Sequence, residues 1–200
     1  MKKIKTILIG MGKIGYGGDL KNKKKIQTHY KALNENKYID LIGVVENKKK
    51  YLKNKKVKIY KNINEIKFLD FELAVVAVPT KDHFKILKFL INLKQSKMIL
   101  CEKPFTDDYK KAKQICILSK KKNKYIYVNY FRRSIPSFIK LKNYLKKSNK
   151  LKKMNVFYSK NLIRNGCHFI DLAHFLFGKI QFNQVNKFRK ELSLKSTNAF

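Results

Sequence analysis

An apolar segment followed at once by closely spaced glycines constrains this chain more than any other feature. Residues 4–9 read IKTILI, and residues 10–15 read GMGKIG. This order predicts a buried parallel strand that turns sharply into a helix. At such a turn Gly10 permits the tight bend, Gly12 lets the backbone approach a pyrophosphate, and Gly15 lets the helix pack closely on the strand. Backbone N–H groups then face the phosphates, so the sequence predicts a dinucleotide site at residues 10–15.

Strand-like and helix-like segments alternate over the first two thirds of the chain, which is typical of a parallel sheet covered by helices. The expected strands are residues 4–9, 39–45, 58–60, 73–78, 98–101 and 125–130. The expected helices cover 83–93 and a segment that Thr106 opens, with Asp107 and Asp108 in its first turn.

The pattern changes after residue 130. We expect a helix over 137–147, a strand over 154–159, a helix over 168–177 that Gly178 ends, and a strand near 181–189. We therefore predict an α/β chain with two domains. Residues 1–122 would form a Rossmann-type, doubly wound parallel sheet that binds NAD(P), and residues 123–200 would begin an α+β substrate domain, incomplete here, whose sheet could form a homo-oligomer.

The net charge of +35 at pH 7 would by itself suggest nucleic acid or an anionic membrane as a partner. Only four of the 48 basic residues are arginines, although planar recognition of phosphates and bases favours arginine. We therefore expect solvated lysine faces and no specific nucleic-acid partner. No run of about 20 apolar residues occurs in the sequence that could span a bilayer, so no membrane partner is expected. The three cysteines lack a C-x-x-C pair, which indicates a cytoplasmic protein without a metal site.

Glu46 ends the predicted strand over 39–45. A carboxylate there can accept both hydroxyls of an adenosine ribose and repel a 2′-phosphate, which favours NAD, although lysines 48–50 weaken that preference and keep NADP as an alternative. Glu46 lies further from Gly15 than the usual spacing of about 20 residues. We attribute the excess to a polar, glycine-rich insertion over 16–27. The other interpretation of Glu46 is a surface carboxylate that ends a strand.

Three further segments carry groups that a nucleotide fold alone does not require. Residues 78–80 and 102–104 each leave a predicted strand at its carboxyl end, where ligands bind in open α/β sheets, and His83 begins the helix after the first of them. His168 and Asp171 stand one helical turn apart. A histidine can relay a proton near neutral pH, and an aspartate at that spacing could orient it. Taken alone, the histidine is more often a capping or packing residue.

Together these segments resemble the Gfo/Idh/MocA oxidoreductases, the family of glucose-fructose oxidoreductase and inositol dehydrogenase. The resemblance runs in order through residues 10–15, 28–29, 78–83, 101–104, 128–133 and 166–171. It implies an NAD(P)-dependent dehydrogenase that transfers a hydride between nicotinamide and a hydroxyl-bearing carbon of a sugar, a cyclitol or a nucleotide sugar, as in surface-polysaccharide pathways. It also implies that Lys103 hydrogen-bonds the reacting hydroxyl and that His168 is the general acid and base.

The motifs and the resemblance indicate two sets of binding residues. The predicted cofactor-binding residues are Gly10, Gly12, Lys13, Ile14, Gly15, Glu46, Val78, Pro79, Thr80, His83, Glu102 and Lys103. The predicted substrate-binding residues are Asn129, Arg132, Arg164 and Asp171.

The chain departs from the family pattern in two respects. Many members carry an aspartate four residues before the catalytic histidine, whereas Arg164 stands there and cannot act as a base. Either His168 works with Lys103 alone, or Arg164 binds an anionic part of the substrate. Proteins of this family are also normally much longer than the 200 residues of this chain, because their substrate domain continues further. The alternative function is therefore a truncated, catalytically weak nucleotide-binding protein or a partner subunit.

Overall fold

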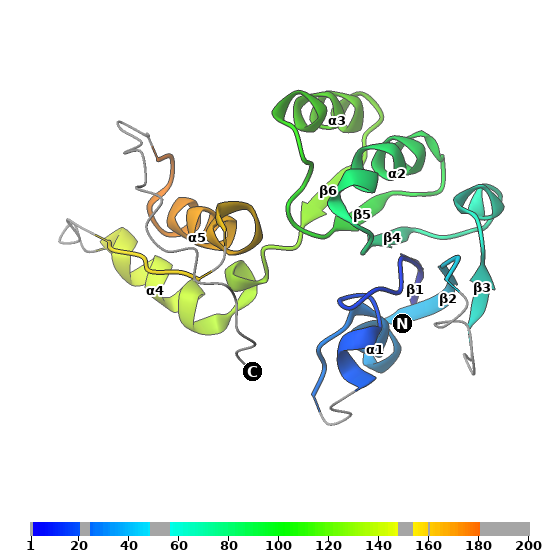
Figure 1. Ribbon diagram of the computed structural model, residues 1–200, viewed down its shortest axis with the longest axis horizontal. Helices are drawn as coiled ribbons and strands as arrows, with labels where there is room; N and C mark the ends of the chain where they lie inside the picture. Colours follow the sequence, from blue (N-terminus) through cyan, green and yellow to red (C-terminus); the bar gives the residue numbers. More distant parts are fainter. Residues whose placement is uncertain (1, 21–24, 49–56, 148–153, 160, 181–200) are drawn as a thin grey trace.

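Six parallel strands form one sheet in the order β3-β2-β1-β4-β5-β6 (Figure 1). The computed structural model describes residues 2–20, 25–48, 57–147, 154–159 and 161–180. The strands are β1 (Ile4–Ile9), β2 (Ile39–Val45), β3 (Lys58–Tyr60), β4 (Leu73–Val76), β5 (Met98–Cys101) and β6 (Tyr125–Val128). The strand order reverses between β1 and β4, which pair directly. This is a doubly wound Rossmann-type sheet, so the α/β prediction is confirmed, and ligands of such sheets bind outside the carboxyl ends of the strands at the reversal.

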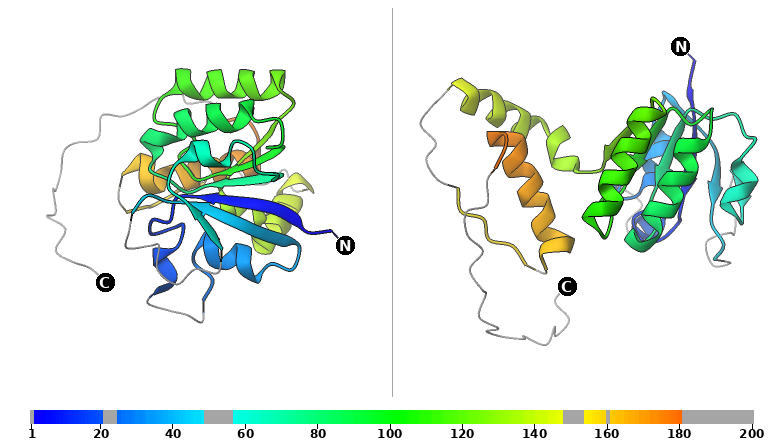
Figure 2. Two further views of the ribbon diagram at one scale, coloured as in Figure 1. Left: turned by 90° about the vertical axis from the view of Figure 1, so that its right-hand side faces the viewer. Right: turned by 90° about the horizontal axis from the view of Figure 1, so that it is seen from above.

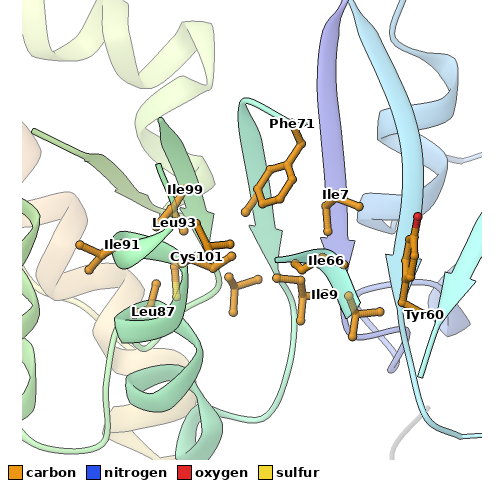
Figure 3. Close-up of a cluster of buried hydrophobic side chains, with 14 of the residues drawn as sticks. Ile7, Ile9, Tyr60, Ile66, Phe71, Leu87, Ile91, Leu93, Ile99 and Cys101 are labelled. Atoms are coloured by element: carbon orange, nitrogen blue, oxygen red, sulfur yellow. The ribbon is translucent and has the colours of Figure 1, made fainter. Parts of the chain in front are cut away.

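Both faces of the central strands are buried, which explains why these strands are rich in apolar residues. Ile7 and Ile9 pack on the face covered by α2 (Thr80–Asn92) and α3 (Tyr109–Lys121). Leu8 points to the other face, against α1 (His29–Glu35). Figure 3 shows the first of these clusters, which includes the fully buried side chain of Phe71. The segment after Ile9 therefore leaves from the centre of a packed core.

The prediction that a helix directly follows the glycines is wrong. Residues 13–16 form a turn, a short 3-10 helix, η1 (Gly17–Leu20), comes next, and α1 begins only at His29. Backbone hydrogen bonds tie the start of α1 back to the glycines, because His29 N–H donates to the Ile14 carbonyl at 3.0 Å and Tyr30 N–H to the Gly15 carbonyl at 2.8 Å. The described part of residues 16–27 thus forms an extra loop whose two ends meet.

Other element boundaries differ by a few residues. The strands β4 and β6 each end two residues before the predicted position. The helix α2 begins at Thr80 rather than at His83. The helix expected to open at Thr106 begins at Tyr109, because Asp108 is its N-cap and accepts the Lys111 N–H at 3.0 Å.

Beyond β6 the regular elements of the described chain are helices. It forms η4 (Phe131–Ser134), α4 (Pro136–Lys147), η5 (Leu162–Gly166) and α5 (Cys167–Phe177), and Figure 2 shows α4 and α5 beside each other. The strand expected over 154–159 is absent, since no described strand lies beside it to complete its hydrogen bonds. The strand expected near 181–189 lies outside the described residues.

The strand β6 pairs with β5, so the first sheet extends past residue 122. The division into domains at 1–122 and 123–200 stays a prediction. Among the described residues, every helix is too short or too polar to cross a lipid bilayer.

Candidate functional site

Residues 10–15, here called the glycine loop, leave the carboxyl end of β1 beside a cavity of about 540 Å³. Gly10 has a φ of +94°, and a Cβ at this position would lie 2.7 Å from the Ala77 carbonyl oxygen, so only glycine fits. Gly12 differs, because no atom lies within 4 Å of the position that its Cβ would occupy. The backbone at Gly12 therefore faces open space that a ligand can approach. The cavity is lined by residues of the glycine loop, β2, the segment after β3, and the start of α2, among them Gly10, Gly12, Glu46, Lys48, Lys61, Val78, Pro79 and Lys81.

Glu46 lies at the wall of this cavity, where the sequence predicts it. Its side chain is buried, and its carboxylate accepts the Met11 N–H at 2.8 Å and the Lys48 N–H at 2.9 Å. Glu46 therefore holds the glycine loop to the end of β2 as well as facing the cavity. The interpretation of Glu46 as a plain surface carboxylate is wrong.

Of the remaining predicted cofactor residues of the first half, Val78 and Pro79 line the cavity, whereas Lys13, Ile14, Gly15 and Thr80 are not among its lining residues. Lys13 and Ile14 are exposed in the turn, whereas Gly15 is buried against the Gly10 backbone. Gly15 therefore closes the turn and does not make the predicted contact between a helix and the strand. Thr80 follows Pro79 as the first residue of α2.

His83, a predicted cofactor contact, is buried between the segments that follow β4 and β5. The residue is 1% exposed, and its Nε2 lies 3.0 Å from the Val78 carbonyl oxygen while its Nδ1 lies 3.1 Å from that of Pro104. Both ring nitrogens thus face backbone carbonyls of the segments that follow β4 and β5. His83 holds these two segments together beneath the site.

Glu102 directly follows β5 and is the centre of a buried polar cluster. Its Oε1 accepts hydrogen bonds from His29 Nε2 at 2.7 Å and from Asn129 Nδ2 at 2.6 Å, and its Oε2 accepts the Lys103 N–H at 3.2 Å. Burial raises the pKa of Glu102, but these hydrogen bonds outweigh burial, so its pKa lies below the ordinary 4.5. An ionised Glu102 therefore links the start of α1, the end of β5 and the end of β6.

His168 lies in the first turn of α5, where the structure brings it close to Lys103. The imidazole is 8% exposed and packs edge-on against the rings of Tyr130 and Phe131. Its Nδ1 is buried without a hydrogen-bond partner in the described part of the chain. Burial, followed by the positive charges of Lys103 and Arg132, lowers the pKa of His168 below 6.5. The positive charge of Lys103 thus acts on His168, the other predicted catalytic residue.

Asp171 does not hydrogen-bond His168, contrary to the prediction from their helical spacing. Its buried carboxylate instead accepts two hydrogen bonds from Arg133, from Nε at 2.8 Å and from Nη2 at 2.6 Å. This ion pair joins η4 to α5. Arg164 belongs to η5, but only its backbone is described, so its predicted role in binding substrate lies outside the described side chains.

The site therefore has two parts: the cavity at the glycine loop, and a cluster where the ends of β5 and β6 meet η4 and α5. Sequence reasoning did not assign His29 or Arg133 to the site, although both lie within the segments that carry the family resemblance, at 28–29 and 128–133.

Comparison with known proteins agrees with this arrangement. A family described as "Oxidoreductase family, NAD-binding Rossmann fold" matches residues 4–130. An uncharacterized oxidoreductase of Schizosaccharomyces pombe is 34% identical over 87 residues, which are 43% of this chain and 23% of that protein.

Two solved structures share the fold at low sequence identity. The WlbA dehydrogenase of Chromobacterium violaceum, in complex with NADH and UDP-GlcNAcA, has a TM-score of 0.73 at 16% identity, over 89% of this chain and 56% of that chain. The myo-inositol 2-dehydrogenase of Lactobacillus plantarum has a TM-score of 0.59 at 19% identity, over 73% of this chain and 42% of that chain. The chain thus spans less than two thirds of each of these proteins. Because the family match covers more than half of its length, the chain belongs to the Gfo/Idh/MocA oxidoreductase family, whose members carry an NAD-binding Rossmann fold.

Proposed function

We propose that this chain binds NAD in the cavity at the glycine loop and acts in the oxidation or reduction of a hydroxyl-bearing carbon of a sugar, a cyclitol or a nucleotide sugar. The cavity fits a nucleotide, because the glycine loop lies along one wall and the place of a Cβ on Gly12 is open. Bound NAD supplies the hydride acceptor for such a reaction, and NADH the donor.

The proposed cofactor contacts are those of the glycine loop and the adjoining strand ends. The backbone of residues 10–15 would hold the phosphates, and Glu46 would accept the ribose hydroxyls. Val78, Pro79 and Thr80 follow β4, and Lys103 follows β5, so all four lie at the carboxyl edge of the sheet. For His83 and Glu102 we propose a positioning role, since, unlike Glu46, they do not line the cavity, and their polar atoms contact other parts of the protein.

In the proposed chemistry His168 exchanges the proton and Lys103 orients the oxygen. The lowered pKa of His168 keeps most of its imidazole neutral at pH 7, which is the form that can take a proton from a hydroxyl group. Its buried, unpartnered Nδ1 supports this assignment most directly, because a buried ring nitrogen without a partner in the described chain is costly unless a ligand completes it. Lys103 is half-buried and would donate a hydrogen bond to the same oxygen.

The predicted substrate residues also divide into direct contacts and residues that position other groups. Arg132 lies near His168 and is proposed to contact substrate. Asn129 and Asp171 are engaged by Glu102 and Arg133, so we propose that they shape the site. Arg164 stays a proposed substrate contact.

The second candidate function is nucleotide binding without turnover by this chain alone. One observation favours it: the solved chains with the same fold are longer than this chain, which covers only 56% and 42% of the two described above. A cytoplasmic location is also proposed, because Cys101, Cys116 and Cys167 are all free thiols. Assembly through the second domain stays a prediction.

Fluorescence titration with NADH and NADPH, followed by absorbance assays of NAD reduction with sugars, myo-inositol and UDP-sugars, tests the proposal. We expect NADH binding, turnover of at least one polyol or sugar, and loss of turnover in Lys103→Ala but not in Lys110→Ala, a matched lysine exposed on α3. Glu46→Gln should weaken the preference for NADH over NADPH. Binding without turnover would favour the second function, and no binding of either nucleotide would refute both.

A further inference from the structure

Arg132 is held in a layered stack of aromatic rings next to His168. Its guanidinium carbon lies 4.9 Å from the ring centre of Phe131 and 5.1 Å from that of Phe169. On its other side Phe169 stacks on Tyr158, with ring centres 6.1 Å apart. Such stacking fixes the plane of the guanidinium and removes water from its faces, which leaves its N–H groups to make the specific contacts.

Those N–H groups are incompletely used. Nη1 of Arg132 is buried and has no hydrogen-bond partner among the described residues. A buried, charged donor without an acceptor is costly, so sites of this kind are completed by a ligand or by water. The nearby carboxylates do not fill this role, because Asp171 is bound by Arg133 and Glu102 by His29 and Asn129.

The position of Arg132 relative to His168 narrows the choice of ligand. Phe131 contacts both groups, since its ring centre lies 5.6 Å from that of His168 and 4.9 Å from the Arg132 guanidinium. An acceptor for Arg132 would therefore belong to the same small molecule that presents its hydroxyl to His168. The use of arginine is itself informative, because four of the 48 basic residues in this lysine-rich chain are arginines and the planar fork matches a carboxylate.

We propose that Arg132 is the anion-recognition residue of the substrate site and that the substrate is an anionic sugar, with a carboxylate close to the reacting hydroxyl. This inference rests on the proposed function, because it takes His168 as the residue that meets that hydroxyl. It adds a substrate class: sugar acids are bound in preference to the neutral sugars from which they derive. A sugar phosphate offers the same anionic oxygens, so the test separates the two sources.

The test is calorimetric titration of the chain with D-glucuronate, D-glucose, D-glucose 1-phosphate and inorganic phosphate, each with and without saturating NADH. We expect glucuronate to bind at least about tenfold more tightly than glucose and more tightly than either phosphate. In Arg132→Gln the preference for glucuronate should disappear, while Arg132→Lys, which keeps the charge but loses the planar fork, should retain only part of it. Lys142→Gln is the matched control, because Lys142 also lies over an aromatic ring, that of Phe175, and its removal changes the net charge equally.

Equal affinities of the wild-type chain for glucuronate and glucose would overturn the inference, as would undiminished glucuronate binding in Arg132→Gln. Equal binding of glucuronate and inorganic phosphate would overturn the assignment of a carboxylate. The NADH titration is a separate measurement, so failure of nucleotide binding, which refutes the proposed function, is distinguishable from failure of sugar-acid selectivity.

Discussion

His29 and Glu102, 73 residues apart in the sequence, form a hydrogen-bonded pair with Nε2 and Oε1 2.7 Å apart and side chains 12% and 10% exposed. His29 is the first residue of α1, directly after the extra loop, whereas Glu102 precedes Lys103 at the end of β5. The pair therefore joins the glycine-loop side of the sheet to the segment that carries the proposed catalytic lysine. Asn129 donates to the same oxygen and extends the connection to the end of β6.

Replacing His29 tests how much this connection contributes. His29→Leu should lower the free energy of unfolding by about 2 kcal/mol near neutral pH, because the buried carboxylate loses a charged hydrogen bond, and His29→Gln, which keeps an N–H donor, should lose less. The folded-state pKa of Glu102 lies below 4.5, so its stabilising effect is fully present above pH 4.5 and is lost as pH falls through that lower pKa. Urea unfolding at about pH 7 and about pH 3 should show the difference from wild type shrinking in acid. A pH-independent difference would contradict a role through Glu102 ionisation.

Gly10 and Gly12 should separate folding from cofactor binding. Gly10→Ala places a methyl group 2.7 Å from a backbone oxygen at a φ of +94°, so we expect the free energy of unfolding to fall by more than about 2 kcal/mol. Gly12→Ala has free space in the protein, so its stability should stay within about 0.5 kcal/mol of wild type. NADH affinity of Gly12→Ala should nevertheless fall about tenfold or more, as measured by fluorescence titration, because the methyl group enters the place of the phosphates. Normal NADH affinity in a stable Gly12→Ala variant would place the nucleotide elsewhere.

The fall of kcat/KM at acidic pH should depend on the charges around His168. Burial and the charges of Lys103 and Arg132 lower the pKa of His168, while Glu102 and Asp171 act in the opposite direction. A general base must be unprotonated, so kcat/KM for oxidation should rise with pH through a value below 6.5 and level off above it.

Arg132→Gln removes one of these positive charges and should raise the pKa of His168, which moves the fall of kcat/KM to higher pH. An NMR titration of the imidazole Cε1–H measures the same pKa without any turnover, and Lys142→Gln serves as the control. A His168 pKa unchanged by Arg132→Gln would contradict the proximity of the two groups.

The sheet could be predicted almost completely from the sequence because each central strand carries an apolar run, such as residues 7–9 and 41–45. Ile4–Ile9 and Ile39–Val45 are examples whose predicted limits match the structure. The glycine loop and Glu46 could be placed by the same logic, since β1 and β2 are neighbours and their carboxyl ends meet at one edge. The strand expected over 154–159 failed because alternating side chains do not specify a pairing partner.

Pairings across the chain could not be predicted in the same way. Nothing local to residues 28–29 indicates that His29 meets Glu102, since that contact depends on the return of the extra loop toward β5. Asp171 shows the opposite error, because its spacing from His168 suggested a local pair. In the structure the Asp171 carboxylate instead accepts hydrogen bonds from two nitrogens of Arg133, a bidentate pairing that an imidazole cannot make.

The Arg133–Asp171 pair should show an asymmetry between its two members. The Asp171 side chain is 9% exposed and that of Arg133 is 47% exposed. Arg133→Leu strands a buried carboxylate and should lower the free energy of unfolding by about 2 kcal/mol. Asp171→Asn leaves a guanidinium that water still reaches, so the loss should be under about 1 kcal/mol. Urea denaturation of both single variants and of the double variant measures the coupling, and NADH affinity should be unchanged in all three because the pair lies outside the cavity at the glycine loop. If Asp171→Asn were the more damaging change, Asp171 would have a further partner, and the hypothesis that it orients His168 would regain support.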